Sequence, residues 1–175
     1  AHADAAEPSE ITDPEQFHTD PQYVAQRIYH EMAHKVWPAD VLPVAWVDIG
    51  TVTLAPYLGA SAKYEKDNIW YSHCITDPDN HPPLQFDPEH PYSQMLEAVL
   101  RKTVELSRGH YFVGMPAIVP NLDVLAELRG TENLLMDMIE RPEWVHEKLQ
   151  EIEAAFVQVF DRLYEILKTE NESMA

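Results

Sequence analysis

The sequence has a single cysteine, Cys74, among its 175 residues. One thiol excludes an internal disulfide bond, and it also excludes a zinc site built from several cysteines of this chain. No run of about 18 apolar residues is present, so the sequence predicts no transmembrane helix. The first residues are small and acidic, and they lack the basic-then-apolar order of a secretory signal. We therefore expect a cytoplasmic protein.

Basic residues are also scarce. Twelve Lys and Arg stand against thirty Asp and Glu, which gives a formal net charge of −18. A surface with this charge repels the phosphates of nucleic acids and the head groups of anionic lipids. We therefore expect neither nucleic acid nor a membrane surface as a partner. Hydrophobic residues make up 45% of the chain, which is typical of a folded globular protein.

Glycine is rare and proline is frequent, with five Gly and fourteen Pro. Residues 1–18 are acidic and contain proline, and they predict an N-terminal loop. Asp20 followed by Pro21 is typical of a helix start, and the apolar spacing behind it predicts a helix to about Val36. Five prolines between residues 77 and 91 predict an irregular crossover.

Two short apolar segments predict the strands of a parallel sheet. Residues 41–49 and residues 110–115 are typical of strands that are buried on both faces. Between them, residues 63–75 predict a hairpin or another excursion of the chain, and residues 91–107 predict a helix. Strands that alternate with helices favour the α/β class. Two parallel strands cannot cover their own edges, so we expect further polypeptide to complete the sheet.

The last third of the sequence predicts three helices. Asn121 is a typical N-cap for the first, Thr131 begins the second, and residues 141–143 (RPE) precede a long third helix. Seven apolar residues recur at helical spacing in the long helix: Val145, Leu149, Ile152, Phe156, Val159, Leu163 and Ile166. We expect this stripe to be buried, with acidic residues such as Glu151 on the surface.

A series of short motifs follows a characteristic order along residues 19–168. The motifs are PVAWVDIG (43–50), YLGA (57–60), DNIWY (67–71), GMP (114–116), NLDVLAELRG (121–130), TENLLMD (131–137) and RPE (141–143). Their order of strand, Pro-containing loop, "LRG-E-LL-D" and "RPE" before a long helix resembles that of the uroporphyrinogen decarboxylase superfamily. The first three motifs resemble its decarboxylase-like branch, which also includes corrinoid methyltransferases.

The resemblance implies an α/β fold that is part of a TIM-type (β/α)8 barrel. Such a barrel takes about 250 residues, so residues 19–168 are expected to form its helix-rich N-terminal portion and residues 169–175 a tail. A following segment or a partner chain is then expected to supply the remaining strands. The exposed sheet edges also predict self-association, and thus a homo-oligomer, for the isolated chain.

The implied activity of the full-length protein is decarboxylation or corrinoid-linked methyl transfer on a small or ring-shaped substrate. The sequence does not distinguish these two reactions. No cofactor is evident in this chain, and a corrinoid or zinc would belong to the full-length protein. The arginine-rich motif that binds the carboxylates of uroporphyrinogen in true decarboxylases is not found here, so uroporphyrinogen itself is not the expected substrate.

Polar residues that follow the two predicted strands are candidates for the active site, because barrel enzymes place their sites at the carboxyl ends of strands. Asp48 ends the first strand, and Asn121 and Asp123 follow the second. Asp48 or Asp123 is a candidate proton donor or relay if burial raises its pKa. For Asp123 the alternative is a stabilising charge in the first turn of a helix. Asn121 is a candidate substrate-binding residue.

Three large side chains, Trp46, Trp70 and Met115, are candidates for an apolar wall that binds a flat ring. Ordinary core packing is the alternative for all three.

Two further hypotheses come from other classes of function. Residues 30–34 (HEMAH) match the H-E-x-x-H zinc helix, in which His30 and His34 bind zinc and Glu31 acts as general base. A metalloprotease also needs a third ligand, often a downstream Glu or His. Separately, His73 and Cys74 are candidates for a metal site or a nucleophile, but two adjacent residues have poor geometry for zinc. We therefore assign no metal ligands. The other hypothesis is a non-catalytic acidic interaction module.

Overall fold

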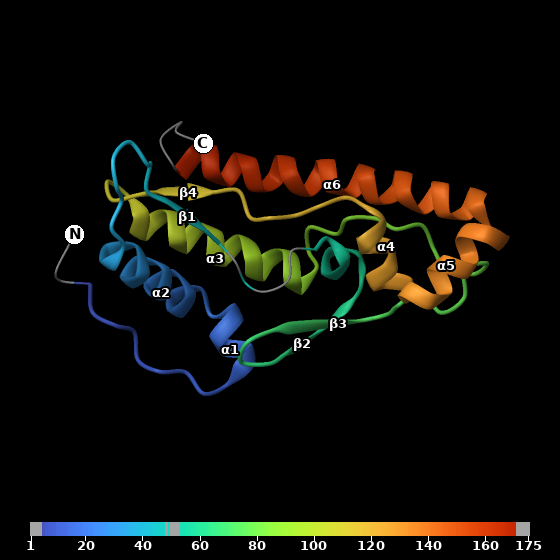
Figure 1. Ribbon diagram of the computed structural model, residues 1–175, viewed down its shortest axis with the longest axis horizontal. Helices are drawn as coiled ribbons and strands as arrows, with labels where there is room; N and C mark the ends of the chain where they lie inside the picture. The colour runs from blue at the N-terminus through green and yellow to red at the C-terminus, as the bar shows by residue number, and fades with distance from the viewer. Residues whose placement is uncertain (1–4, 48, 50–52, 171–175) are drawn as a thin grey trace. The chain divides into compact units, whose positions relative to one another are not determined.

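The two segments predicted as parallel strands pair with each other. The computed structural model describes residues 5–47, 49 and 53–170, without the side chains of residues 169 and 170. Strands β1 (Val44–Trp46) and β4 (Phe112–Gly114) are parallel, and Val44 lies opposite Phe112 (Figure 1). The parallel pairing is confirmed, although both strands are shorter than predicted. The expected burial of both faces is wrong, because the Trp46 side chain is 63% exposed.

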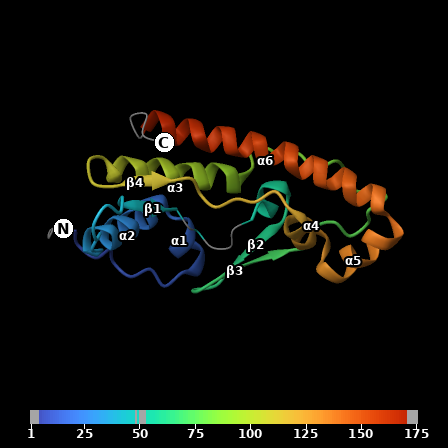
Figure 2. The same cartoon turned by 45° about the horizontal axis from the view of Figure 1, so that its top comes forward.

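The remaining elements give a mixed helix and strand fold in which helices predominate. In chain order they are α1 (Pro14–Thr19), α2 (Pro21–His34), η1 (Ala55–Leu58), β2 (Ser61–Tyr64), β3 (Ile69–Ser72), α3 (Pro91–Ser107), α4 (Leu122–Arg129), α5 (Thr131–Glu140) and α6 (Pro142–Glu170). Strands β2 and β3 form the predicted hairpin (Figure 2). The α/β class is thus supported, while the two sheets in the described residues have two strands each and form no closed barrel.

The loop predicted for residues 1–18 is wrong at its carboxyl end, where α1 begins at Pro14. Asp13 caps this helix, since its side chain accepts a hydrogen bond of 2.9 Å from the Gln16 amide. Asp13 and Pro14 therefore form the same start signal as Asp20 and Pro21, whose prediction is confirmed. Helix α2 ends at His34, slightly before the predicted end at Val36.

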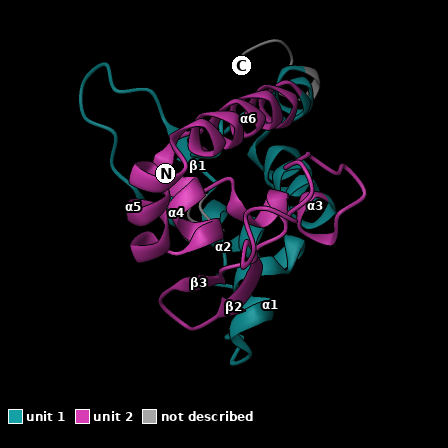
Figure 3. Ribbon diagram, turned by 90° about the vertical axis from the view of Figure 1, so that its right-hand side faces the viewer, with its two compact units in different colours: residues 1–50, 94–117, 162–175 teal, residues 51–93, 118–161 magenta. Residues whose placement is uncertain are grey.

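The chain divides into two units, which Figure 3 shows in two colours. Unit 1 contains residues 1–50, 94–117 and 162–175, and unit 2 contains residues 51–93 and 118–161. The parallel strand pair, α1, α2 and most of α3 belong to unit 1. The hairpin, η1, α4, α5 and most of α6 belong to unit 2.

Buried apolar side chains line one face of each long helix. In α2 they are Val24, Ala25, Ile28 and Met32, and in α3 they are Leu96, Val99, Leu100 and Val104. The predicted stripe of α6 is confirmed, with five of its seven side chains buried and Leu149 and Phe156 half-buried. These faces are the ones that the helical periodicity predicts.

Glu151 is not the surface residue that the sequence predicts. Its carboxylate accepts a hydrogen bond of 2.7 Å from the Leu84 amide, and Lys148 donates to both of its oxygens at 3.0 and 2.9 Å. The Lys148 side chain is only 4% exposed. This buried pair therefore attaches the proline-rich crossover to α6, because Leu84 lies within the irregular segment between β3 and α3.

The carboxyl end of α4 is held by the chain that follows β3. The amides of Cys74 and Ile75 both donate to the Leu128 carbonyl at 2.9 Å. Arg129 makes the return contact, because its Nη1 donates to the carbonyls of Ile75 and Thr76 at 3.1 and 3.0 Å. The two amides thus satisfy a carbonyl that the end of a helix leaves without a partner, and Arg129 satisfies two carbonyls of the chain after β3.

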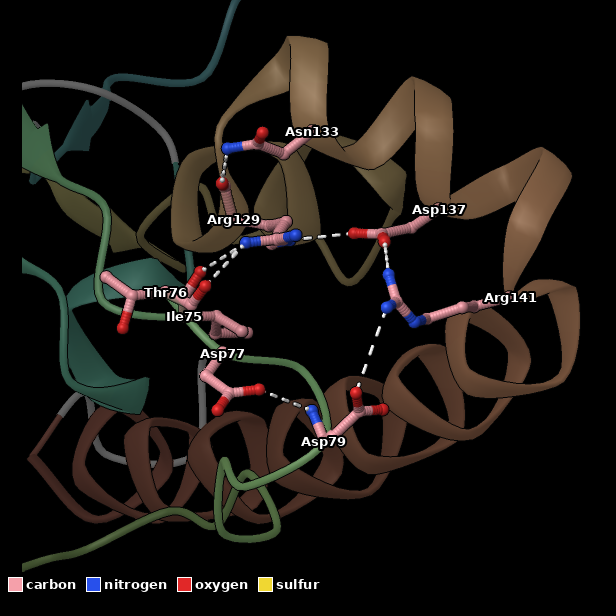
Figure 4. Close-up of polar contacts among 8 residues, drawn as sticks. All are labelled: Ile75, Thr76, Asp77, Asp79, Arg129, Asn133, Asp137 and Arg141. Carbon is pink, nitrogen blue, oxygen red and sulfur yellow. Dashed lines mark hydrogen bonds and ion pairs between the residues drawn. The ribbon is translucent and has the colours of Figure 1, made fainter.

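Asp137 of α5 is buried between two arginines (Figure 4). The Nε atom of Arg129 donates to its Oδ2 at 2.7 Å, and Nη1 of Arg141 donates to its Oδ1 at 2.9 Å. Burial alone would raise the pKa of Asp137, but the two guanidinium groups outweigh that effect and the pKa is lowered. The carboxylate therefore connects α4, α5 and the start of α6.

We expect Asp137→Asn to lower the free energy of unfolding at pH 7 by about 3 kcal/mol, because it leaves the guanidinium of the largely buried Arg129 side chain without its carboxylate partner. The lowered pKa of Asp137 means that its stabilisation is present above about pH 4 and is lost as the pH falls through the lowered value. Urea unfolding of both proteins between neutral and acidic pH measures this difference, which should shrink at acidic pH.

The matched control is Asp79→Asn, because Asp79 lies 3.8 Å from Arg141 but is 72% exposed. We expect its free energy of unfolding to stay within about 0.5 kcal/mol of the unaltered protein. Equal losses of unfolding free energy in the two variants would contradict the claim that Asp137, and not Asp79, provides the stabilising contacts with the arginines.

Candidate functional site

The start of α4 holds two of the predicted site residues. Asn121 is the N-cap, and its side-chain oxygen accepts a hydrogen bond of 3.1 Å from the Asp123 amide. Its Nδ2 donates to Oδ2 of Asp123 at 2.9 Å. Both residues are exposed, and Asp123 lies in the first turn, where its negative charge is favourable to the helix dipole.

Glu127 lies one helical turn beyond Asp123 and is half-buried. The hydroxyl of Thr53 donates a hydrogen bond to Oε2 of Glu127. Thr53 is itself 4% exposed, and its Oγ1 accepts a hydrogen bond of 3.1 Å from the Ala55 amide. This amide orients the hydroxyl, so the start of η1 fixes the position of the Glu127 carboxyl group.

The surroundings of Glu127 raise its pKa. Burial is the largest cause, the hydrogen bond from Thr53 partly offsets it, and the charge of Asp123 raises the pKa further. A carboxyl group with a raised pKa holds its proton to higher pH, which is the property that a general acid needs. Asp123 and Glu127 therefore form an acidic pair in which the half-buried member is suited to donate a proton.

The other predicted site residues are distributed between the two units. Trp70 lies in β3 of unit 2, is 57% exposed, and donates from Nε1 to Glu65 at 3.3 Å. Trp46 lies in unit 1, where its ring covers Gly114; a Cβ atom at Gly114 would stand 3.0 Å from that ring. Ordinary core packing is therefore wrong for both tryptophans, while Met115 is half-buried. Asp48 lies outside the described residues.

Glu127 is the site residue that the sequence reasoning missed. Its spacing of four from Asp123 is visible in the sequence and places both carboxyl groups on one face of a helix. Its partner Thr53 is 74 positions away, so the contact that orients the carboxyl group depends on the tertiary fold. Helix α4 also packs against β3, the strand that carries Trp70.

The H-E-x-x-H segment gains little support as a zinc site. The rings of His30 and His34 lie 4.2 Å apart, but Nδ1 of His30 is 2.9 Å from the Ala5 carbonyl and Nδ1 of His34 is 2.7 Å from the His30 carbonyl. Glu31 forms an ion pair with Lys35. Within residues 5–47, 49 and 53–170, no group of three His, Cys, Asp or Glu side chains is placed to hold a metal ion.

His73 and Cys74 have structural contacts instead. Nδ1 of His73 lies 2.7 Å from the Glu127 carbonyl. Burial raises the pKa of the half-buried Cys74 thiol, which makes it a weaker nucleophile at neutral pH. Both residues thus help to hold the end of α4.

Comparison of the chain with models of known protein families, with curated proteins and with solved structures gave no match. Among the helices of the described residues, none combines the length and the apolar composition that a bilayer crossing needs.

We expect the pKa of Glu127 to lie above the ordinary glutamate value of about 4.3. Asp123→Asn should lower this pKa, because it removes a nearby negative charge, and Thr53→Val should raise it further, because it removes a hydrogen bond to the ionised form. NMR titration of the side-chain carboxyl carbon measures all three values. A Glu127 that titrates at or below its ordinary pKa would contradict the site.

The raised pKa of Glu127 also makes the folding stability of the chain depend on pH. Ionisation of Glu127 costs more in the folded chain than in the unfolded chain, so the stability that it contributes is present below its ordinary pKa and is lost as the pH rises through the raised value. Glu127→Gln should remove this loss. Thermal unfolding at several pH values tests it, and an unchanged pH profile in the variant would count against the raised pKa.

Proposed function

We propose that this chain is the N-terminal portion of a barrel enzyme of the uroporphyrinogen decarboxylase superfamily, and that Glu127 donates a proton during decarboxylation of a small or ring-shaped substrate. The observation that carries the proposal is the half-buried Glu127 carboxyl group with its raised pKa, oriented by Thr53 and one turn from Asp123. The motif that contains Asn121, Asp123 and Glu127 is also one of those on which the family resemblance rests.

The parallel strand pair supports the barrel architecture. A (β/α)8 barrel begins with a strand, a crossover that includes a helix, and a second strand parallel to the first. Strand β1, helix α3 and strand β4 follow this order, with the β2–β3 hairpin inserted in the crossover. In the proposed enzyme, additional strands from further polypeptide or a partner chain pair with the outer edges of β1 and β4.

The proposed reaction is loss of carbon dioxide followed by proton transfer from Glu127 to carbon. The bond between the substrate carbon and its carboxylate breaks, carbon dioxide leaves, and the electron pair remains on the carbon. The Glu127 carboxyl group then gives its proton to that carbon and becomes a carboxylate. Asp123, which is exposed, returns a proton from solvent to Glu127. Trp70 offers an exposed indole on β3, the strand against which α4 packs, for contact with a flat substrate ring.

Corrinoid-linked methyl transfer is the second reaction that the resemblance implies. A corrinoid or a zinc ion would supply that chemistry in the full-length protein. The raised pKa of Glu127 favours decarboxylation over this alternative, because decarboxylation needs a group that donates a proton to carbon and methyl transfer does not. Uroporphyrinogen is not the proposed substrate, since the sequence lacks the arginine-rich motif for its carboxylates.

We expect the full-length protein to release carbon dioxide from at least one member of a panel of pyrrole, benzene and phenylacetic carboxylic acids. Glu127→Gln should lower kcat by about 100-fold or more with little change in KM, because it removes the proton donor. In the unaltered enzyme, kcat should fall as the pH rises through the raised pKa of Glu127. Trapping of labelled carbon dioxide measures these rates.

Glu132→Gln serves as the matched control, because it makes the same change on an exposed residue of α5. The control should retain full activity. Full activity in Glu127→Gln would contradict the assigned proton donor. Methyl transfer from methylcobalamin without any release of carbon dioxide would select the second reaction instead.

A further inference from the structure

Helix α5 carries four of its five apolar side chains on the outside. Leu135, Met136, Met138 and Ile139 are 57%, 53%, 44% and 78% exposed. At 100° per residue they occupy one face of the helix, which we call the outer face of α5. The opposite face is buried through Leu134 and through Asp137, which points toward Arg129 and Arg141 in Figure 4. Most of the apolar surface of this helix is therefore exposed, whereas an ordinary surface helix buries it.

The outer face has the properties of an interaction surface. Scattered exposed apolar residues are normal, but four large ones on a single ten-residue helix form a contiguous patch. Two of the four are methionines, whose flexible thioether side chains adapt to different partner surfaces. Asp137 fixes the orientation of α5, because rotating the outer face inward would expose or break its pairs with both arginines.

Charge indicates which partner fits. Glu132 lies at the start of the outer face, three residues before Leu135, and Glu140 lies at its end, and both are exposed. The chain as a whole carries a net charge of −18. In an antiparallel pair of α5 helices from two copies, Glu132 of one would lie beside Glu140 of the other, and these like charges repel. A basic partner makes the opposite, favourable contact at both ends.

We propose that the outer face of α5 binds an amphipathic helix of a partner protein, with apolar side chains on one stripe and Lys and Arg beside it. The partner's apolar residues at helical spacing pack against Leu135, Met136, Met138 and Ile139. Its basic residues pair with Glu132 and Glu140. This site uses none of the residues around Glu127, so its test does not depend on the proposed reaction.

The test uses three fluorescent peptides of about 18 residues, a length that supports a helix. One is an amphipathic Leu/Lys helix, one is the same helix with Glu in place of Lys, and one is a scrambled Leu/Lys peptide. We expect the amphipathic Leu/Lys peptide to bind at least tenfold more tightly than either of the others in anisotropy titrations. The double variant Met136→Ser and Ile139→Ser should weaken this binding at least tenfold.

Two controls distinguish peptide binding at the outer face of α5 from general electrostatic attraction to the chain. Val36→Ser alters another exposed apolar residue, in unit 1, and should bind as the unaltered protein does. The pair Glu132→Gln and Glu140→Gln should weaken binding several-fold and reduce its salt dependence. Circular dichroism should show the same helix content in all variants, because every altered side chain is exposed.

Three results would overturn the proposal. Equal binding of the scrambled peptide would show attraction to the negative charge of the chain alone. Unchanged binding in the double α5 variant would place the peptide elsewhere. A dimer in sedimentation experiments that Ile139→Ser abolishes would show that a second copy of this chain occupies the face.

Discussion

The pairing of β1 with β4 is the constraint on which the rest of the structure depends. Each strand has three paired residues, and within the described part of the chain each pairs with the other alone. A parallel sheet of this size is stable only when its edges and faces are covered. Trp46 covers Gly114 on one face yet remains 63% exposed. The pair is therefore the observation that supports the proposed completion of the sheet by additional polypeptide.

In unit 2 the corresponding constraint is electrostatic. The motif residues Arg129, Asp137 and Arg141 are those on which the family resemblance partly depends, and they form one buried network. Arg129 also bonds to the chain after β3, so this network fixes the end of α4 and the orientation of α5. Two consequences follow: Glu127 is held near Thr53, and the apolar face of α5 is left on the outside. The same network therefore positions both the candidate proton donor, Glu127, and the candidate docking surface, the outer face of α5.

Local signals predicted most elements, because caps and periodicity act over a few residues. Asn121 caps α4, residues 91–107 form α3, and the stripe of α6 is buried, all as predicted. The elements and contacts that the sequence did not predict were missed for two different reasons. Asp13 and Pro14 carry a helix signal that the acidic composition of residues 1–18 obscured. Glu151 and Glu127 depend on partners 67 and 74 positions away, which no local pattern shows.

The pairing of β1 and β4 in the native protein is the most direct test of this account. A crystal structure, or NMR detection of hydrogen bonds across the strands, determines it. The account predicts that β1 and β4 remain adjacent and parallel, and that each pairs on its outer edge with another parallel strand. A native protein in which they form an isolated two-stranded sheet, or pair with antiparallel strands, would contradict the barrel.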